Sequence, residues 1–191
     1  PLAISSPSRR TEISSAGALK PDSGSVTGGL FCVLCPQETD TPPDALADFA
    51  LDYGREARRL REIFHLDDEM PWRFDELSHG ERKKLQVAVA LWQRPDALVL
   101  DEPTAALDPV SEYEVYRKFN AISGGKTALY ISHRLASCRF CDEILVFLAG
   151  SIVQHGAHEA LLQEKNGEYA RLWHAQAQYY DDSLQKKNSV K

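Results

Sequence analysis

Hydrophobic residues recur along the chain with two different spacings, and each spacing predicts one kind of element. The strongest helix prediction follows Ser78, where four apolar residues take the spacing i, i+3, i+4 and i+7 of one helix face: Leu85, Ala88, Val89 and Trp92. Ser78 is the expected N-cap of this helix, and Pro95 ends the pattern.

Weaker helical patterns occupy other parts of the chain. Residues 44–66 predict two short amphipathic helices that are broken near Gly54, and their apolar stripe is expected to face the core. The segments 111–122 and 168–180 each predict one helix, and the segment HRLASCRF, residues 133–140, predicts the start of another.

Short apolar runs between turn residues predict the strands. Residues 30–34, 97–100 and the end of GGKTALYIS, residues 124–132, each predict one buried strand. The segment 142–156 predicts two strands that are joined as a hairpin at Ala149-Gly150. Strands alternate with helices, and this order favours an α/β fold with a mostly parallel sheet.

The two ends of the chain differ in composition from its middle. Residues 1–29 contain seven serines, three prolines and four glycines without apolar periodicity, so we expect a poorly ordered segment there. Residues 30–180 are expected to form one partial domain with a helical subdomain at about 40–92. Residues 181–191 are expected to form a frayed polar tail.

The composition of the 191-residue chain narrows its possible functions. The net charge of −6, without a basic block, argues against non-specific binding to the phosphates of nucleic acids. The apolar runs are shorter than the roughly 18 residues that cross a bilayer, and the N-terminus has no apolar signal core. We therefore expect a soluble, cytoplasmic protein, which still allows docking on a membrane partner.

Four cysteines form two CxxC pairs, Cys32 with Cys35 and Cys138 with Cys141, and this raises the alternative of a zinc site. About a hundred residues separate the pairs, against roughly 15–20 in compact zinc ribbons. Residues three apart in a strand also point to opposite faces, which disfavours the first pair as metal ligands. Reduced thiols with a structural role are the expected outcome.

Two adjacent acids, Asp101 and Glu102, follow the buried run ALVL. Adjacent residues point in different directions, so one carboxylate can hold a metal ion while the other faces a substrate. Such a pair suits hydrolysis of a magnesium-bound phosphoanhydride. Two acids at a strand end are equally often part of a solvated turn without a catalytic role. His133 follows the second buried strand in the same way, so we expect it at the same sheet edge, as a satisfied polar residue or a catalytic one.

The segment LSHGE, residues 77–81, lies at the start of the strongest predicted helix. Its hydroxyl group and the first backbone amides of the helix suit an anion site, or only an N-cap.

In this order and spacing, LSHGERKKL, ALVLDEP, AALD and ISH resemble the nucleotide-binding domain of ABC ATPases. The resemblance covers about residues 18–180 and is most specific over 77–133. It implies a P-loop NTPase-like α/β fold, with a mostly parallel sheet flanked by helices and a short helical subdomain. It also implies binding and hydrolysis of ATP with Mg2+.

The resemblance assigns the hydrolytic roles position by position. Asp101 resembles the Walker B aspartate that supports Mg2+, and Glu102 resembles the general base. His133 resembles the switch histidine that senses the γ-phosphate. Gln37 resembles the Q-loop glutamine, which binds the nucleotide and its Mg2+ and couples them to the helical subdomain and to a partner.

Other positions resemble residues that act across a dimer. Ser78, Gly80 and Glu81 resemble the signature motif, which would contact ATP held by a second ABC ATPase domain. Asp108 in AALD resembles the D-loop residue that reaches the partner domain. The implied partners are therefore a second such domain, in a homodimer or heterodimer, and a transmembrane permease encoded elsewhere.

The sequence departs from the family pattern at two places. His79 stands in the signature where the family usually has glycine, and Glu81 where many members have glutamine. No G-x-x-x-x-G-K-[ST] phosphate loop occurs in the 191 residues. We therefore expect that the N-terminal part is truncated or degenerate. Either the start of the gene was lost or scrambled, or the nucleotide site is degenerate.

Three hypotheses remain open. Residues 30–104 look most like ABC-F translation factors, whereas residues 105–180 look like exporter-type transporter ATPases. The first hypothesis is an ABC transporter ATPase, peripheral at the inner face of a membrane. The second is an ABC-F-type ribosome-associated ATPase. The third is a degenerate half-domain that contributes only signature and D-loop residues to a partner's ATP site.

Overall fold

The computed structural model describes residues 2–5, 31–103 and 127–176, which fall into two units. The α4 unit is the part between residues 7 and 131 and takes its name from its long helix α4. The hairpin unit combines residues 1–6 with 132–191. Both units mix strands with helices, so the predicted α/β class is confirmed.

Three parallel strands form the sheet of the α4 unit in the order β2 (Cys32–Cys35), β3 (Ala97–Asp101), β4 (Thr127–Ile131). In their register Cys35 lies opposite Leu100, and Asp101 lies opposite Ile131. Parallel pairing brings the carboxyl ends of the three strands to one edge. The three predicted strands and their parallel direction are confirmed.

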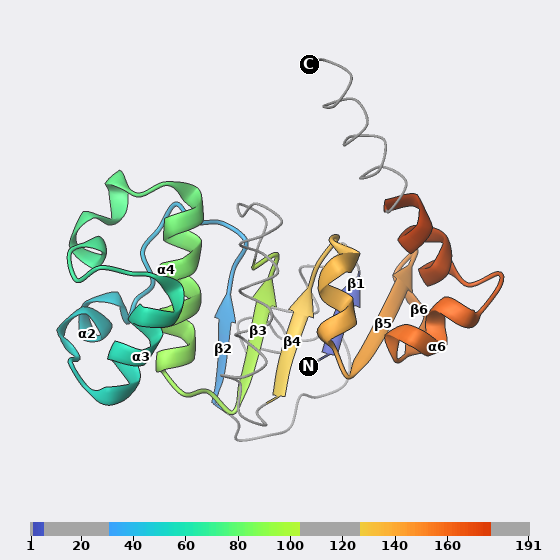
Figure 1. Cartoon of the computed structure of the whole chain (residues 1–191), viewed down its shortest axis with the longest axis horizontal. Helices are drawn as coiled ribbons and strands as arrows, with labels where there is room; N and C mark the ends of the chain where they lie inside the picture. Colours follow the sequence, from blue (N-terminus) through green and yellow to red (C-terminus); the bar gives the residue numbers. More distant parts are fainter. Residues whose placement is uncertain (1, 6–30, 104–126, 177–191) are drawn as a thin grey trace, which may run out of the picture. The chain divides into compact units, whose positions relative to one another are not determined.

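Helix α4 (His79–Trp92) lies beside β2 and contacts the short helices α2 (Leu46–Leu51) and α3 (Arg55–Phe64) (Figure 1). Its first turn is a capping box between Ser78 and Glu81, which confirms the predicted N-cap. Every residue from Leu85 to Leu91 is buried, more than one predicted stripe, because β2 and the two short helices cover different sides of α4.

The predicted break near Gly54 separates α2 from α3 and is confirmed. Asp52 Oδ1 accepts a hydrogen bond from the Gly54 N–H, and Asp52 Oδ2 accepts one from Trp92 Nε1, each at 2.6 Å. The buried Arg61 side chain donates to three carbonyl oxygens at the end of α2: Phe49, Ala50 and Asp52. These bonds satisfy the backbone groups that a helix end leaves without partners.

The hairpin unit holds β1 (Leu2–Ser5), which pairs in parallel with β5 (Glu143–Leu148), and β6 (Ser151–Gly156), which pairs antiparallel with β5. A two-residue turn joins β5 to β6, with φ of 49° at Ala149 and 81° at Gly150. Positive φ at both turn residues is typical of the type I′ hairpin turn. The predicted hairpin is confirmed.

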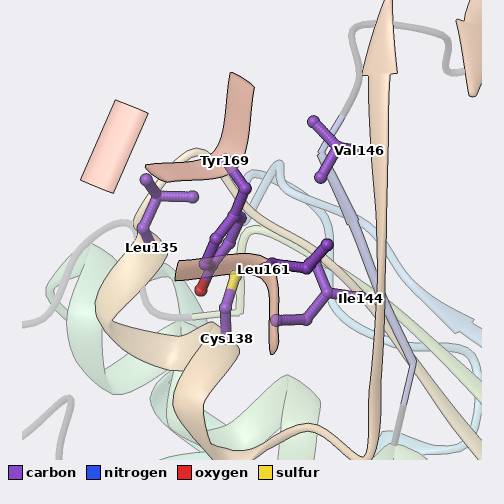
Figure 2. Packing of buried hydrophobic residues seen from close by; sticks show 6 residues of the cluster. All are labelled: Leu135, Cys138, Ile144, Val146, Leu161 and Tyr169. Carbon is purple, nitrogen blue, oxygen red and sulfur yellow. The ribbon is translucent and has the colours of Figure 1, made fainter. Parts of the chain in front are cut away.

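An apolar cluster forms the core of the hairpin unit (Figure 2). It contains buried side chains from η2 (Leu135–Phe140), β5, α6 (His158–Gln163) and the helix over 168–176: Leu135, Cys138, Ile144, Val146, Leu161 and Tyr169. The Tyr169 hydroxyl is hydrogen-bonded to His158 Nδ1 at 2.7 Å. The one polar group of this large buried ring therefore has a partner.

Some elements differ from the predictions. The helix predicted from His133 is the short 3-10 helix η2, because Ser132 and Ser137 side chains bond the backbone of Arg134 and compete with α-helical bonding. Strand β1 and the 3-10 helix η1 (Met70–Glu76) were not predicted, since four and seven residues show little periodicity.

Several predictions lie outside the described residues. These are the helix at 111–122, most of the N-terminal segment 1–29, the end of the helix at 168–180 and the polar tail. Within the described ranges, every helix is too short or too polar to cross a bilayer.

Candidate functional site

The two acids lie at the carboxyl end of β3. Asp101 is the last residue of the strand and is half-buried, whereas the Glu102 side chain is only 5% exposed. Glu102 has a φ of 44°, in the left-handed region that costs an L-residue about 1–2 kcal/mol. Its N–H donates to the Ile131 carbonyl oxygen at 2.9 Å. The backbone therefore leaves the extended conformation at Glu102, as is common where the surrounding structure fixes a functional residue.

A buried lysine from α4 lies next to this strand end. Lys83 is 2% exposed, and its Nζ donates to the Pro36 carbonyl oxygen at 2.5 Å and to the Asp101 carbonyl oxygen at 3.2 Å. Burial lowers the pKa of the Lys83 ammonium, while the neighbouring Cys35 and Asp101 act in the opposite direction. One side chain thus bonds the backbone at the ends of both β2 and β3.

The segment after β2 carries Gln37, whose side chain is exposed. Side chains of α4 bond the residues that follow it: Gln86 Nε2 donates to the Glu38 carbonyl oxygen at 2.9 Å, and His79 Nδ1 is hydrogen-bonded to Thr39 Oγ1 at 2.9 Å. The structure therefore brings Gln37, Asp101 and Glu102 to the same edge of the α4 unit, with the start of α4 beside them.

The start of α4 contains the three residues that resemble the signature motif, Ser78, Gly80 and Glu81. Ser78 is exposed, and its N–H and Oγ donate to Glu81 Oε2 at 2.9 and 2.6 Å. These two bonds, the Oγ bond first, lower the pKa of the Glu81 carboxyl. Gly80 is half-buried in the same turn, and the amides of a first turn have no intrahelical acceptor. The helix dipole adds a partial positive charge at this end.

For two predicted site residues, the structure gives no position relative to Gln37, Asp101 and Glu102. His133 is exposed and belongs to the hairpin unit, where its carbonyl oxygen accepts a hydrogen bond from Gln176 Nε2. Its expected position at the same sheet edge as Asp101 stays a prediction. Asp108 lies outside the described residues.

All four cysteines are free thiols. Cys32 and Cys35 lie on β2, and Cys138 and Cys141 lie on η2 and directly after it. Burial raises the pKa of the Cys35 thiol, and it raises that of Cys141 to about 12. Within the described parts of the chain, no three His, Cys, Asp or Glu side chains gather where they could hold a metal ion. Protonated thiols of this kind are poor nucleophiles and poor ligands.

A groove of about 410 Å3 lies between β2, the segment 41–45 and α4. Gln86 lines this groove and is 5% exposed, yet its Oε1 has no hydrogen-bond partner among the residues that the structure describes. A buried acceptor without a donor costs about 1–3 kcal/mol.

Comparison with known proteins agrees with this geometry. The sequence profile of the ABC transporter family matches residues 32–105, which include β2, α4 and β3. Residues 32–105 are therefore similar to part of the nucleotide-binding domain of ABC transporters.

Two curated relatives and one solved structure show the extent of the likeness. The chain is 44% identical over 100 residues to ABC transporter B family member 6 of Dictyostelium discoideum, covering 52% of this chain and 15% of the relative. It is 42% identical over 108 residues to an ATP-dependent lipid A-core flippase of Syntrophus aciditrophicus, covering 56% and 18%.

The solved structure is that of a bacterial Atm1-family ABC exporter with ATP bound. It is 27% identical with a TM-score of 0.64, and the match covers 76% of this chain and 28% of that one. The chain therefore spans less than a fifth of the length of either curated relative, and it shares the fold of part of an exporter.

Sequence reasoning missed Lys83 and Gln86. The predicted stripe did not include them, but they lie at i and i+3 of a second face that continues with Val87 and Ala90 at i+4 and i+7 from Lys83. That second stripe was the available signal of burial. The left-handed conformation of Glu102 left no signal, since glutamate is not a residue that favours it.

Proposed function

We propose that the chain is an ATP-binding and ATP-hydrolysing part of an ABC transporter, which couples ATP-driven dimerisation to transport through a membrane partner. The observation that carries the proposal is the strand end of β3, where half-buried Asp101 precedes a buried Glu102 in a left-handed conformation. The family match and the relatives, which are transporters by name, support transport over the ribosomal alternative.

The donor set at this edge fits Mg2+. Asp101 offers a half-buried carboxylate, and Gln37 offers an exposed amide oxygen at the end of the neighbouring strand. Mg2+ prefers oxygen ligands and commonly keeps waters and substrate phosphates beside one or two side chains, so a larger protein cluster is not needed. When bound, the ion neutralises charge on the phosphates of ATP.

Glu102 acts as the general base in this proposal. The backbone turns at Glu102, so the two adjacent carboxyl groups would serve different roles: that of Asp101 would hold the metal ion, and that of Glu102 would accept the proton of the attacking water. The fixed backbone of Glu102 limits the reorganisation needed at the moment of reaction. His133 would detect the γ-phosphate from the neighbouring strand end.

A second ABC domain completes the site. Ser78, Gly80 and the first amides of α4 would bind the γ-phosphate of ATP held by that domain, and the helix dipole favours this anion. Ser78 Oγ would then donate to the phosphate in place of Glu81. Asp108 would contact the partner domain in return.

The membrane partner would contact the groove beside Gln37. A permease segment would pack into this groove, which Gln86 lines. In this arrangement the chain would lie at the cytoplasmic, inner face of the membrane, and the Q-loop would couple the nucleotide state to the partner. Co-purification with a permease, as against ribosomes, tests this part of the proposal.

Binding of labelled ATP with Mg2+ to the purified chain tests the proposal. We expect saturable binding with micromolar affinity, a weaker dependence on Mg2+ in Asp101→Asn, and no change in Asp48→Asn, which alters an exposed acid of α2. Absence of saturable binding would contradict the proposal and favour a half-domain that acts only on a partner's ATP.

A further inference from the structure

We propose that Lys83 is a positioning residue for ATP hydrolysis, which fixes the backbone next to Gln37 and the backbone of Glu102 through two hydrogen bonds. The inference rests on the proposed function and adds to it a residue to which the family resemblance assigns no role.

The first step concerns the peptide group between Asp101 and Glu102. Its carbonyl oxygen accepts from Lys83 Nζ at 3.2 Å, and its N–H donates to the Ile131 carbonyl oxygen at 2.9 Å. Oxygen and hydrogen point to opposite sides of a trans peptide, so the two bonds together limit rotation of the peptide plane. That rotation sets the φ of Glu102, which is 44°. Lys83 thus helps to hold the proposed base in a strained conformation.

The second step concerns the other bond of the same ammonium group. Lys83 Nζ also donates to the carbonyl oxygen of Pro36, in the peptide group that contains the N–H of Gln37. A single cation therefore bonds the peptide groups that precede a proposed Mg2+ ligand and the proposed base. One side chain thus links the two peptide groups beyond the last paired residues of β2 and β3.

The third step concerns the rigidity of the element that carries Lys83. Helix α4 has fourteen residues and a complete capping box, and Leu85 and Val89 are fully buried. Two further contacts, from His79 to Thr39 and from Gln86 to Glu38, bond the same helix to the segment after Gln37. A rigid helix with several contacts is able to fix positions at the strand ends to within the tolerance that hydrolysis requires.

The variants separate donation from packing. Lys83→Met keeps a long apolar stem but removes every donor, and Lys83→Arg restores donors on a similar stem. Lys84→Met is the matched control, since it makes the same change at the adjacent, half-buried position of α4.

Turnover of the wild-type chain with Mg2+ and ATP gives the first readout. We expect Lys83→Met to lower kcat by at least about tenfold with KM for ATP changed less than about threefold, and Lys83→Arg to recover part of kcat. Lys84→Met should keep the wild-type values. Unchanged kcat in Lys83→Met, or equal losses in Lys83→Met and Lys83→Arg, would overturn the inference.

Backbone amide exchange gives a second readout that needs no turnover. In Lys83→Met we expect the amides of Gln37 and Glu102 to exchange at least about tenfold faster, while those of Leu85 and Val89 in α4 stay unchanged. Equal acceleration at all four amides would show a purely structural role, and no acceleration would show no role. If the wild-type chain neither binds nor hydrolyses ATP, the proposed function fails, and this comparison still decides on Lys83.

Discussion

The two units differ in what they bury. Within the described residues, the buried polar side chains of the α4 unit are two cations, an acid, an amide and a threonine: Arg61, Lys83, Glu102, Gln86 and Thr39. Those of the hairpin unit are two serines, Ser132 and Ser137. Buried charges are costly and persist where their contacts or their chemistry require them. The α4 unit is therefore the place where chemistry is expected.

The ionisable groups packed in the hairpin unit show the same difference between the two units. Burial raises the pKa of the Tyr169 hydroxyl and of the Cys141 thiol, so both stay protonated and neutral near pH 7. Tyr169 and Trp173 also stack with ring centroids 6.3 Å apart, and His158 packs edge-on against both rings. These groups form a packed core, whereas Lys83 bonds backbone carbonyl oxygens and Glu102 is the proposed general base.

The largest effect is expected from Glu102→Gln. The amide keeps the size of the side chain but does not accept a proton, so kcat should fall by about 10²–10⁴-fold while the affinity for Mg2+ and ATP stays within about threefold. Steady-state turnover and equilibrium ATP binding on the same preparation measure the two quantities. Glu164→Gln, at an exposed acid of the hairpin unit, is the control, and turnover that persists in Glu102→Gln would remove Glu102 from the role of base.

The second prediction compares two leucines of equal size. Leu85 in α4 is 0% exposed and Leu161 in the hairpin unit is 1% exposed, so each change to alanine should lower the free energy of unfolding by about 2–5 kcal/mol. Only Leu85→Ala should also weaken ATP binding, because α4 carries the contacts to the site. Denaturant unfolding and ATP titration measure both quantities, and equal losses of binding would argue against a division of roles between the units.

The third prediction concerns the strain at Glu102. Glu102→Ala and Glu102→Gly both remove the carboxylate, but glycine adopts a φ of 44° without the penalty of an L-residue. The glycine variant should therefore be more stable than the alanine variant by about 1 kcal/mol in denaturant unfolding. The same pair of changes at Leu148, an exposed β5 residue before the turn, should favour alanine. A less stable Glu102→Gly would indicate that the backbone is not strained there.

Particular residues show how far the sequence predicted this arrangement. The strands β2 to β6, the hairpin turn at Ala149-Gly150, the helix α4 and its Ser78 cap follow from local periodicity and turn chemistry, and all are confirmed. Asp101 and Glu102 were placed at a strand end for the same reason. The conformation of Glu102 and the burial of Lys83 depend on contacts with residues far away in sequence, namely Ile131 and Pro36. The second stripe of α4 signals that Lys83 is buried, but local patterns do not show which distant residues it contacts.

The smallest expected effect is a pH dependence at the start of α4. The hydrogen bonds from Ser78 Oγ and from the Ser78 N–H lower the pKa of Glu81, so the folded state is stabilised by the ionised carboxylate. This contribution is present above the unfolded pKa of about 4.3 and is lost as the pH falls through the lower folded value. It should stay below about 1 kcal/mol, because the pair lies near the surface.

Glu81→Gln measures this contribution, since the amide keeps an acceptor for the Ser78 bonds but does not titrate in this range. The difference in unfolding free energy between wild type and Glu81→Gln should shrink from pH 6 to pH 3, because the unfolded pKa of glutamate, about 4.3, lies between these two pH values. Glu62→Gln, at an exposed acid of α3, should show a smaller change. A difference that stays constant across this range would indicate that Glu81 is not bonded to Ser78 in solution, and Ser78 would then be available to a phosphate without competition.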